Sequence, residues 1–225
     1  MGKADKIIES WFANADNWIA VIDNAEIESR KLCTNQAVIQ SILSYPVNTI
    51  LDIGCGEGWL AGTLRSYGKL SYGVDVVPAL IENAIQKDGN FYQLASYASL
   101  AKGIQLAIGS FDAAVMNFSL LDKNDSENLL KSLRRYVTTD GFVFIQTLHT
   151  AAIEDNERSG WREGSWNGFK RAFIKPYNWY FRTLADWYSL FAEAGLKVIE
   201  IKEPLHPATQ KPLSFIFVLQ LQTPG

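Results

Sequence analysis

The chain has 225 residues, of which 48% are hydrophobic and 20% charged, as in one ordinary globular domain; this excludes a mainly disordered chain. The formal net charge of -3 disfavours a dedicated nucleic-acid binder, which normally has a strong basic excess. The two cysteines, Cys33 and Cys55, are too few for a disulfide framework and suit a reducing compartment.

The first residues contain no apolar core of the kind that a signal peptide needs. No apolar run approaches the roughly 18 residues that span a bilayer. We therefore expect a cytoplasmic protein without membrane insertion, present as a monomer or a homodimer.

In chain order, the pattern predicts a helical region over about residues 6–43, ended by Pro46, and then alternating strands and helices. Five apolar runs predict strands, at residues 49–53, 70–76, 90–94, 111–116 and 142–148. Segments of helical periodicity lie between some of them, at residues 59–67, 78–86 and 126–137. A last helix at 184–194 precedes two β-rich runs, 196–202 and 214–222, which we expect to pair antiparallel at one sheet edge. This alternation is typical of an α/β domain with a parallel sheet.

Residues 150–182 interrupt the alternation, and a connection of that length inside a compact domain is usually functional. The segment carries eight aromatic residues, Trp161, Trp166, Phe169, Phe173, Tyr177, Trp179, Tyr180 and Phe181. We interpret it as a lid that excludes water from a small-molecule site. A nucleic-acid stacking surface, suggested by basic residues such as Lys170 and Arg171, is the less favoured alternative.

The most informative segment is residues 50–58, which reads Ile-Leu-Asp-Ile-Gly-Cys-Gly-Glu-Gly and joins a strand to a helix. Its glycines allow positive φ angles and let a ligand contact the backbone, and the next helix offers free N–H groups. A dinucleotide-binding turn would need a third glycine where Trp59 stands. This difference disfavours a nicotinamide-dependent oxidoreductase.

The Asp-x-Gly-x-Gly-x-Gly spacing resembles motif I of the class I S-adenosylmethionine (SAM)-dependent methyltransferases. Asp75 ends the second strand, as does the acidic residue that binds the ribose hydroxyls in that family, and a carboxylate can accept both hydroxyl hydrogens. Residues 111–121 resemble the family's fourth-strand motif, with Asn117 at the lip of the pocket. The resemblance covers roughly residues 47–148, and the C-terminal strands match the family's reversed hairpin.

The resemblance implies a Rossmann-like α/β fold, with a seven-stranded, mostly parallel sheet, an antiparallel edge strand and helices on both faces. We expect a single methyltransferase domain over residues 1–225. Its parts would be a helical cap that carries Trp11 and Trp18, a cofactor-binding core, the inserted lid, and a C-terminal helix with the edge hairpin, at residues 1–45, 47–148, 150–182 and 183–225.

The resemblance also implies that SAM binds beyond the carboxyl ends of the strands and leaves as S-adenosylhomocysteine (SAH). The expected cofactor-binding residues are Arg30, Asp52, Gly54, Cys55, Gly56, Gly58, Asp75, Val76, Ser96, Tyr97 and Asn117. Arg30 is a candidate for the methionine carboxylate, with an ion pair to Glu26 as the alternative. Many relatives contact adenine with an acidic residue after the third strand, whereas this chain reads Leu-Ala-Ser-Tyr at 94–97.

His149 directly follows the fifth strand and is the candidate general base, with a structural histidine at a strand end as the alternative. The residues expected at the acceptor or in the lid are Trp161, Trp166, Tyr177, Trp179, Arg182 and His206. With only two histidines in the chain, we expect no metal site.

The expected reaction is in-line transfer of the SAM methyl group to an O, N or C nucleophile of a small molecule. A non-catalytic SAM-binding or scaffold protein and an RNA methyltransferase are the alternatives. Residues 116–119 read Met-Asn-Phe-Ser, without the Asn-Pro-Pro-Tyr type of motif, which weakens methylation of nucleic-acid bases. The pattern looks most like the broad group that includes quinone-biosynthesis methyltransferases, so the acceptor stays open.

Overall fold

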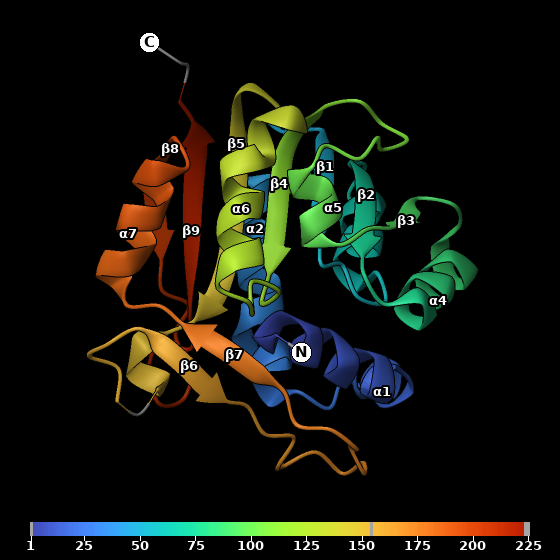
Figure 1. Cartoon of the computed structure of the whole chain (residues 1–225), viewed down its shortest axis with the longest axis vertical. Coiled ribbons are helices and arrows are strands. Elements are labelled where there is room, and N and C mark those ends of the chain that lie inside the picture. Colours follow the sequence, from blue (N-terminus) through green and yellow to red (C-terminus); the bar gives the residue numbers. More distant parts are fainter. Residues whose placement is uncertain (1, 154, 223–225) are drawn as a thin grey trace.

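The computed structural model describes residues 2–153 and 155–222. Its centre is a seven-stranded sheet in the order β3-β2-β1-β4-β5-β9-β8 (Figure 1). The strands are β1 (Thr49–Ile53), β2 (Leu70–Asp75), β3 (Tyr92–Leu94), β4 (Phe111–Asn117), β5 (Val137–Leu148), β8 (Leu196–Lys202) and β9 (Ser214–Leu221). A separate two-stranded antiparallel sheet joins β6 (Gly160–Glu163) to β7 (Asn178–Phe181).

The direction of the strands confirms the predicted mostly parallel sheet. β1 pairs in parallel with β2 and β4, β2 with β3, and β4 with β5. β9 is the antiparallel strand, and it lies between β5 and the edge strand β8. The two last strands therefore form the antiparallel pair that the sequence predicts at this edge.

Helices cover both faces of the sheet. The helices of the structure are α1 (Lys3–Asp23), α2 (Asn35–Leu43), α3 (Trp59–Ser66), α4 (Pro78–Asp88), α5 (Tyr97–Ala101), α6 (Asn124–Ser132) and α7 (Leu184–Glu193), with short helical turns η1 (Arg30–Thr34), η2 (Leu133–Arg135) and η3 (Thr150–Ala152). One apolar cluster joins the sheet to α5, α6 and α7 through Leu100, Leu129 and Phe191. A second cluster on the other face joins it to α2 and α3 through Val38 and Leu60.

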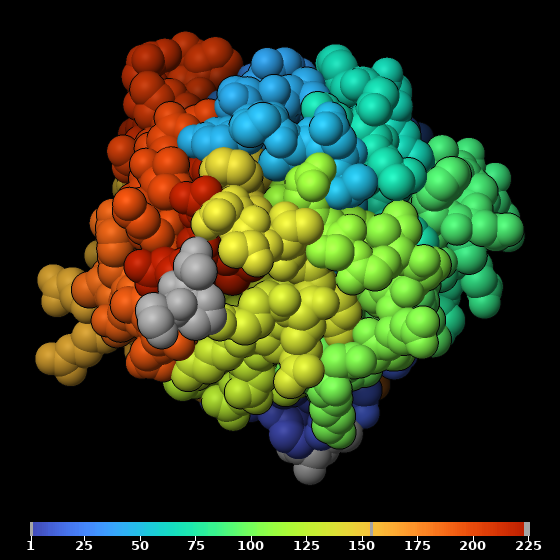
Figure 2. All heavy atoms as spheres, turned by 90° about the horizontal axis from the view of Figure 1, so that it is seen from above, coloured from blue at the N-terminus to red at the C-terminus, as the bar shows by residue number. Residues whose placement is uncertain are grey.

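The central strands are apolar on both faces because helices bury both faces. In β4, residues 113–116 are fully buried, and in β9 residues 214–219 are buried. The carboxyl ends of the parallel strands therefore belong to a rigid core. α1 crosses beneath these ends, with β6 and β7 beside it (Figure 1). At the opposite end of the molecule, the segments that precede β1, β4 and β5, in blue, green and yellow, lie beside the orange surface of the C-terminal part (Figure 2).

Besides the β6–β7 sheet, which the sequence does not predict, three details differ from the predicted elements. The N-terminal helical region is interrupted between α1 and η1, where Ala25 has a φ of 49°. The helix expected to end at residue 137 stops earlier, and β5 already begins at Val137 with a register shift against β4 and a left-handed Asp140 (φ 61°). The five-residue helix α5 is not predicted, because a helix of that length shows no periodicity.

Candidate functional site

The glycine turn between β1 and α3 has a left-handed backbone at Gly54, Gly56 and Gly58, with φ of 75°, 58° and 85°. A Cβ atom on Gly54 would lie 2.5 Å from Ser119 Cβ, and one on Gly58 would lie 2.5 Å from the Tyr92 hydroxyl oxygen. A Cβ on Gly56 would meet nothing closer than 3.8 Å. The outer glycines thus allow close packing, and the middle glycine borders open space.

Asp75 fixes this turn to the end of β2. Its Oδ2 accepts the Gly56 N–H at 3.0 Å, and its Oδ1 accepts the Val77 N–H at 2.9 Å. Burial raises the pKa of Asp75, and these backbone donors oppose that rise. Each carboxylate oxygen has a second lone pair, so Asp75 can still accept hydrogen bonds from a ligand.

The segment after β4 is fixed against the same turn. The Tyr97 hydroxyl donates to the Ser119 carbonyl at 2.8 Å, and Ser119 Oγ donates to the Ile53 carbonyl at 2.8 Å. Burial raises the pKa of Tyr97 above its usual range, so its hydroxyl stays a donor. These bonds hold the ends of β1 and β4 and the start of α5 at one place.

A cavity opens between these strand ends and α1. It contains about 980 Å³ of space free of protein atoms, part of which is continuous with solvent. Nine of the predicted cofactor residues line it, namely Arg30, Gly54, Cys55, Gly56, Asp75, Val76, Ser96, Tyr97 and Asn117.

Two predicted cofactor residues, Asp52 and Gly58, do not line the cavity. Asp52 is 1% exposed and lies below the turn. Its pKa is raised to about 8, first by burial and then by the carboxyl groups of Glu57 and Asp75. Both residues therefore support the turn from inside the fold.

Glu57 also lines the cavity. It is not among the predicted site residues, because in the sequence it is only the residue between two glycines of the turn. It is 3% exposed and its Oε1 has no hydrogen-bond partner among the described residues. Asn117 Oδ1 is likewise buried without a described partner. Burial raises the pKa of Glu57, and the charge of Arg30 is among the effects that oppose this rise. Buried acceptors in native proteins normally have donors, so these two atoms fit a ligand with N–H groups.

Arg30 lies in an aromatic setting. Its guanidinium carbon is 5.1 Å from the Trp18 ring centroid and 5.8 Å from that of Trp59. Burial lowers the pKa of Arg30, and the charge of Glu57 acts in the opposite direction. Glu26 instead pairs with Arg171 at 3.2 Å, so the alternative ion pair of Arg30 is not formed. Arg30 can therefore meet an anionic group in the cavity.

His149 is buried, but it is not among the residues that line the cavity. Its Nδ1 accepts the Ala151 N–H at 3.0 Å, which leaves Nε2 to donate to Glu203 Oε1 at 2.8 Å. Its ring also packs 4.1 Å from the Phe215 ring centroid. Both ring nitrogens are thus hydrogen-bonded within the fold, an arrangement that fits the structural alternative.

Part of the predicted lid packs against α1 instead of lining the cavity. Trp166 stacks on Phe173 at 4.2 Å and meets the edge of Trp11 at 5.4 Å. Tyr177 lies 4.7 Å from Trp166 and 6.3 Å from Trp11. Trp11 and Trp18 of the predicted cap line the cavity, so Trp166 and Tyr177 form a second layer that supports them. Asn14 adds hydrogen bonds from α1 to the same segment, at residues 174 and 175.

The remaining acceptor and lid residues also lie outside the cavity lining, at Trp161, Trp179, Arg182 and His206. Trp161 packs on Tyr180, and Trp179 meets the edge of Phe181. Arg182 is 3% exposed and donates to the backbone carbonyl of Lys123 at 2.9 Å. His206 Nδ1 accepts backbone N–H groups within its own loop. These four side chains contact neighbouring parts of the fold instead of the cavity.

Comparison with known proteins identifies the family. A model of the methyltransferase domain matches residues 26–201. The chain belongs to the methyltransferase-domain family. Protein arginine N-methyltransferase 1 of Schizosaccharomyces pombe is 28% identical over 75% of this chain and 53% of its own length. The 2-phytyl-1,4-naphthoquinone methyltransferase of Trichormus variabilis is 30% identical over 64% of this chain and 54% of its own.

This methyltransferase domain thus spans about half the length of the curated relatives that it matches. Among solved structures, a SAM-dependent methyltransferase of Methanosarcina mazei has the same fold, with a TM-score of 0.64 and 17% identity over 82% of this chain and 98% of that one. SAM is therefore the cofactor of the family to which the chain belongs.

Two further findings concern only residues 2–153 and 155–222. No helix there has the combination of length and hydropathy needed to cross a membrane. No group of three or more histidine, cysteine, aspartate or glutamate side chains there is arranged to bind a metal ion.

Proposed function

We propose that this chain is an enzyme that transfers the methyl group of SAM to an O, N or C nucleophile of a small molecule, with SAH as the second product. The observation that carries the proposal is the cavity in which the glycine turn, Asp75 and Arg30 meet. The unpartnered oxygens of Glu57 and Asn117 in the same cavity support a ligand with a cationic donor.

Each part of SAM has a proposed partner in this cavity. Asp75 accepts the ribose hydroxyls, Arg30 pairs with the methionine carboxylate, and Asn117 Oδ1 accepts from the ammonium group. The apolar Val76 lies beside Ser96 in the lining and forms the adenine side, where no carboxylate follows β3. The left-handed turn allows the ligand to approach the backbone closely.

Bound SAM supplies a methyl group that is already activated by the sulfonium charge. The protein then needs mainly to align the acceptor and exclude water. Trp11 and Trp18, which cover the cavity from α1, perform the second task. His149 is not required for either, because its nitrogens are engaged elsewhere.

Two observations support a small acceptor. Residues of α1 cover the cavity, and the name of one relative gives a naphthoquinone as its substrate. Four of the five charged residues that line the cavity are acidic, which disfavours a nucleic-acid acceptor. We propose a cytoplasmic protein, as a monomer or homodimer, because its two cysteines are free and suit a reducing compartment.

Calorimetric and thermal-shift titrations with SAH, SAM and NAD test the cofactor. We expect both adenosyl ligands to bind and to stabilise the fold, by about 2.7 kcal/mol at a hundredfold excess over the dissociation constant. NAD should have no effect. Asp75→Ala should abolish the stabilisation, whereas Asp16→Ala, on the exposed side of α1, should keep it. Failure of SAM and SAH to bind would refute the proposal.

Turnover is tested separately by SAH release with a panel of small-molecule acceptors. Acceptor-dependent SAH formation is expected. If SAM binds tightly and no acceptor produces SAH, the non-catalytic SAM-binding alternative replaces the enzyme.

A further inference from the structure

One end of the cavity is not used by the proposed cofactor residues. It lies between the first turns of α1 and the segment after β4, and its apolar wall consists of Ala4, Ile7, Ile8, Trp11 and Leu121. The four α1 residues follow the i, i+3, i+4, i+7 spacing of a single helix face. This end is therefore a continuous apolar surface rather than a few scattered side chains.

Two carboxyl groups, those of Asp122 and Asp125, line the same end. Across the whole cavity the charged lining residues are Arg30, Glu57, Asp75, Asp122 and Asp125, which is one cation against four acids. Arg30, Glu57 and Asp75 belong to the part around the glycine turn. The acceptor end therefore has an excess of negative charge.

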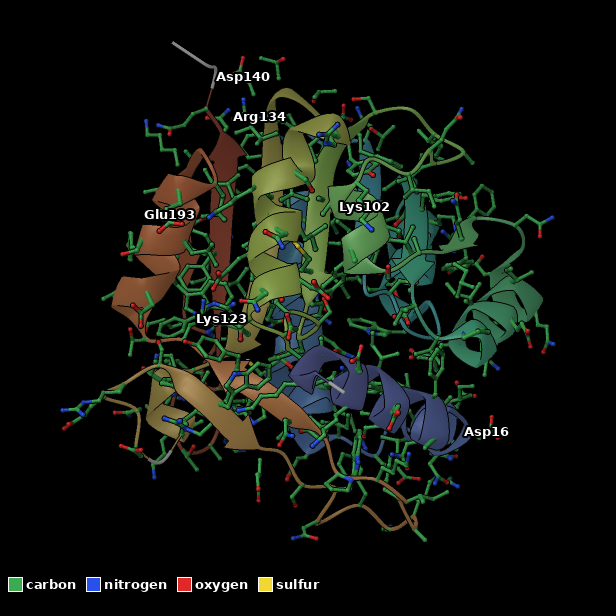
Figure 3. All side chains as sticks on the ribbon, viewed as in Figure 1. Asp16, Lys102, Lys123, Arg134, Asp140 and Glu193 are labelled. Carbon is green, nitrogen blue, oxygen red and sulfur yellow. The ribbon has the colours of Figure 1, made fainter. Side chains whose placement is uncertain are left out.

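Two basic residues near these acids are paired with another carboxylate. Lys123 Nζ pairs with Glu127 at 3.0 Å, and Arg182 pairs with the same carboxylate at 3.4 Å. Lys123 lies at the lower end of α6 in Figure 3. Asp122 Oδ1 accepts the Asp125 backbone N–H at 2.7 Å, which holds the two acids together. Burial raises the pKa of Asp125, and the negative charges of Asp122 and Asp5 raise it further. A bound cation would relieve this repulsion.

Glu57 adds a further acidic group on the cofactor side of the same cavity. Its side chain is 3% exposed, and Oε1 has no hydrogen-bond partner within the described residues. A buried carboxylate oxygen without a donor is costly unless a ligand supplies one. On the cofactor side this donor can come from SAM, so Asp122 and Asp125 remain the carboxyl groups available to the acceptor.

We propose that the acceptor is a small apolar amine, whose hydrocarbon part packs on the α1 face and whose ammonium group pairs with Asp122 and Asp125. The ammonium gives one proton to one of these carboxylates, and the lone pair of the neutral nitrogen then forms the bond to the methyl carbon as the carbon–sulfur bond breaks and SAH leaves. This inference rests on the proposed methyl transfer and names its substrate class. The apolar wall supplies binding through burial, and the two carboxylates select the charge of the ligand.

The test uses the SAH-loaded protein and three probes of similar size that differ in charge. Calorimetric titrations with 2-phenylethylamine, 2-phenylethanol and 3-phenylpropanoate compare a cation, a neutral molecule and an anion on one aromatic skeleton. We expect the amine to bind about tenfold more tightly than the alcohol, and the carboxylate to bind more weakly than both. The preference for the amine should shrink as salt is added.

Two variants assign the preference to residues. Asp122→Asn and Asp125→Asn should each weaken amine binding about fivefold and leave binding of the alcohol and of SAH unchanged. The side-chain amide in Asp122→Asn would retain a carbonyl oxygen for the Asp125 N–H, and thermal unfolding verifies that each variant is folded. Asp16→Asn makes the same change of charge on the far part of α1 (Figure 3) and should have no effect.

Equal affinity for the three probes, or tightest binding of the anion, would overturn the acceptor class while SAH binding still supported methyl transfer. An amine preference that survives both substitutions would overturn the assignment to Asp122 and Asp125. If SAH itself did not bind, the proposed function would fail and the acceptor class with it.

Discussion

Asp52 shows how the buried acids of the site affect the fold. It is fully enclosed, its Oδ2 has no partner among the described residues, and its pKa is raised to about 8 from the ordinary 3.8. Burial is the main cause, followed by the charges of Glu57 and Asp75, while the Ala61 backbone and Arg65 favour the charged form. Around neutral pH the folded protein therefore holds Asp52 largely as the neutral acid.

This raised pKa predicts how stability depends on pH. Between the unfolded pKa of 3.8 and the folded value of about 8, the folded state binds the proton and the unfolded state does not. The free energy of unfolding should therefore fall as pH rises through that window, by at most about 1.4 kcal/mol per pH unit for this group. Asp52→Asn should flatten the decrease, because it keeps the shape without the charge.

Urea denaturation at about pH 5 and about pH 8 measures the effect. Glu57 and Asp75 also have raised pKa values, so a smaller decrease should remain in the variant. Asp16→Asn, whose side chain is exposed, should behave as the unmodified protein. An unchanged slope in Asp52→Asn would show that Asp52 is ionised in the folded state.

His149 is expected to matter for stability and not for cofactor binding. His149→Ala removes two hydrogen bonds and a ring contact with Phe215 and should lower the free energy of unfolding by about 1–3 kcal/mol. Denaturation and SAH calorimetry measure the two properties, with His206→Ala as the less destabilising control. A variant that kept its stability but lost methyl transfer would restore a catalytic role.

Substitution of Gly54 can distinguish the stability cost of backbone strain from the cost of a steric contact. Gly54→Ala places a Cβ atom 2.5 Å from Ser119 Cβ at a φ of 75°. Gly68 is a matched control, because its φ is 78° and a Cβ there would meet nothing within 4 Å. Gly68→Ala should cost about 1 kcal/mol from strain alone, whereas Gly54→Ala should cost more and also weaken SAH binding. Denaturation and calorimetry compare the two, and equal losses would show that the Ser119 contact is unimportant.

At the scale of elements, the segment 164–177 acts on the cavity through α1. Trp166→Ala removes contacts with Trp11, Trp18 and Phe173, so α1 should be held less firmly. We expect a loss of about 1–3 kcal/mol in stability and weaker SAH binding. Trp179→Ala is the control, because the described ring contact of Trp179 is with Phe181. SAH calorimetry measures the affinity of each variant. An unchanged affinity in Trp166→Ala would show that α1 does not need the contacts of Trp166 for SAH to bind.

Elements with strong local signals could be predicted closely from the sequence. β1 occupies Thr49–Ile53 as expected, because a compact apolar run precedes a glycine turn. α4 begins at Pro78 and α7 at Leu184, where a proline and the Thr183 cap define the first turn. The contact of Trp166 with α1 could not be predicted, because its partner Trp11 is distant in the sequence and only tertiary packing joins them.

In the site, too, features that depend on local spacing could be predicted, and features that depend on tertiary packing could not. The glycine turn and Asp75 are recognisable because their geometry depends on local spacing. Glu57 becomes a buried cavity residue only once α1 covers the turn, so its type and position gave no signal. His149 stands at the expected strand end, but its ring turns to Glu203 and Phe215, whose positions depend on the distant C-terminal strands.

In the whole molecule, the cavity has one rigid wall and one wall held by side-chain contacts. The ends of β1, β2 and β4 belong to the buried sheet, whereas α1 is fixed largely by its contacts with α4 and with the segment before β7. Ligand binding should therefore change the dynamics mostly on the α1 side. Local opening is governed by the number of buried contacts that an element makes.

Hydrogen exchange with and without SAH measures this directly. We expect SAH to slow exchange in the glycine turn, in α1 and in residues 164–177. The slowing should be equal in α1 and residues 164–177, because Trp11 and Asn14 of α1 contact that segment. The loop between β8 and β9, which contains His206 and lies outside the cavity, should be unchanged. Asp75→Ala should show no slowing at the same SAH concentration. Protection of α1 without residues 164–177 would show that the two segments move independently, and the aromatic layer would then have no part in closing the cavity.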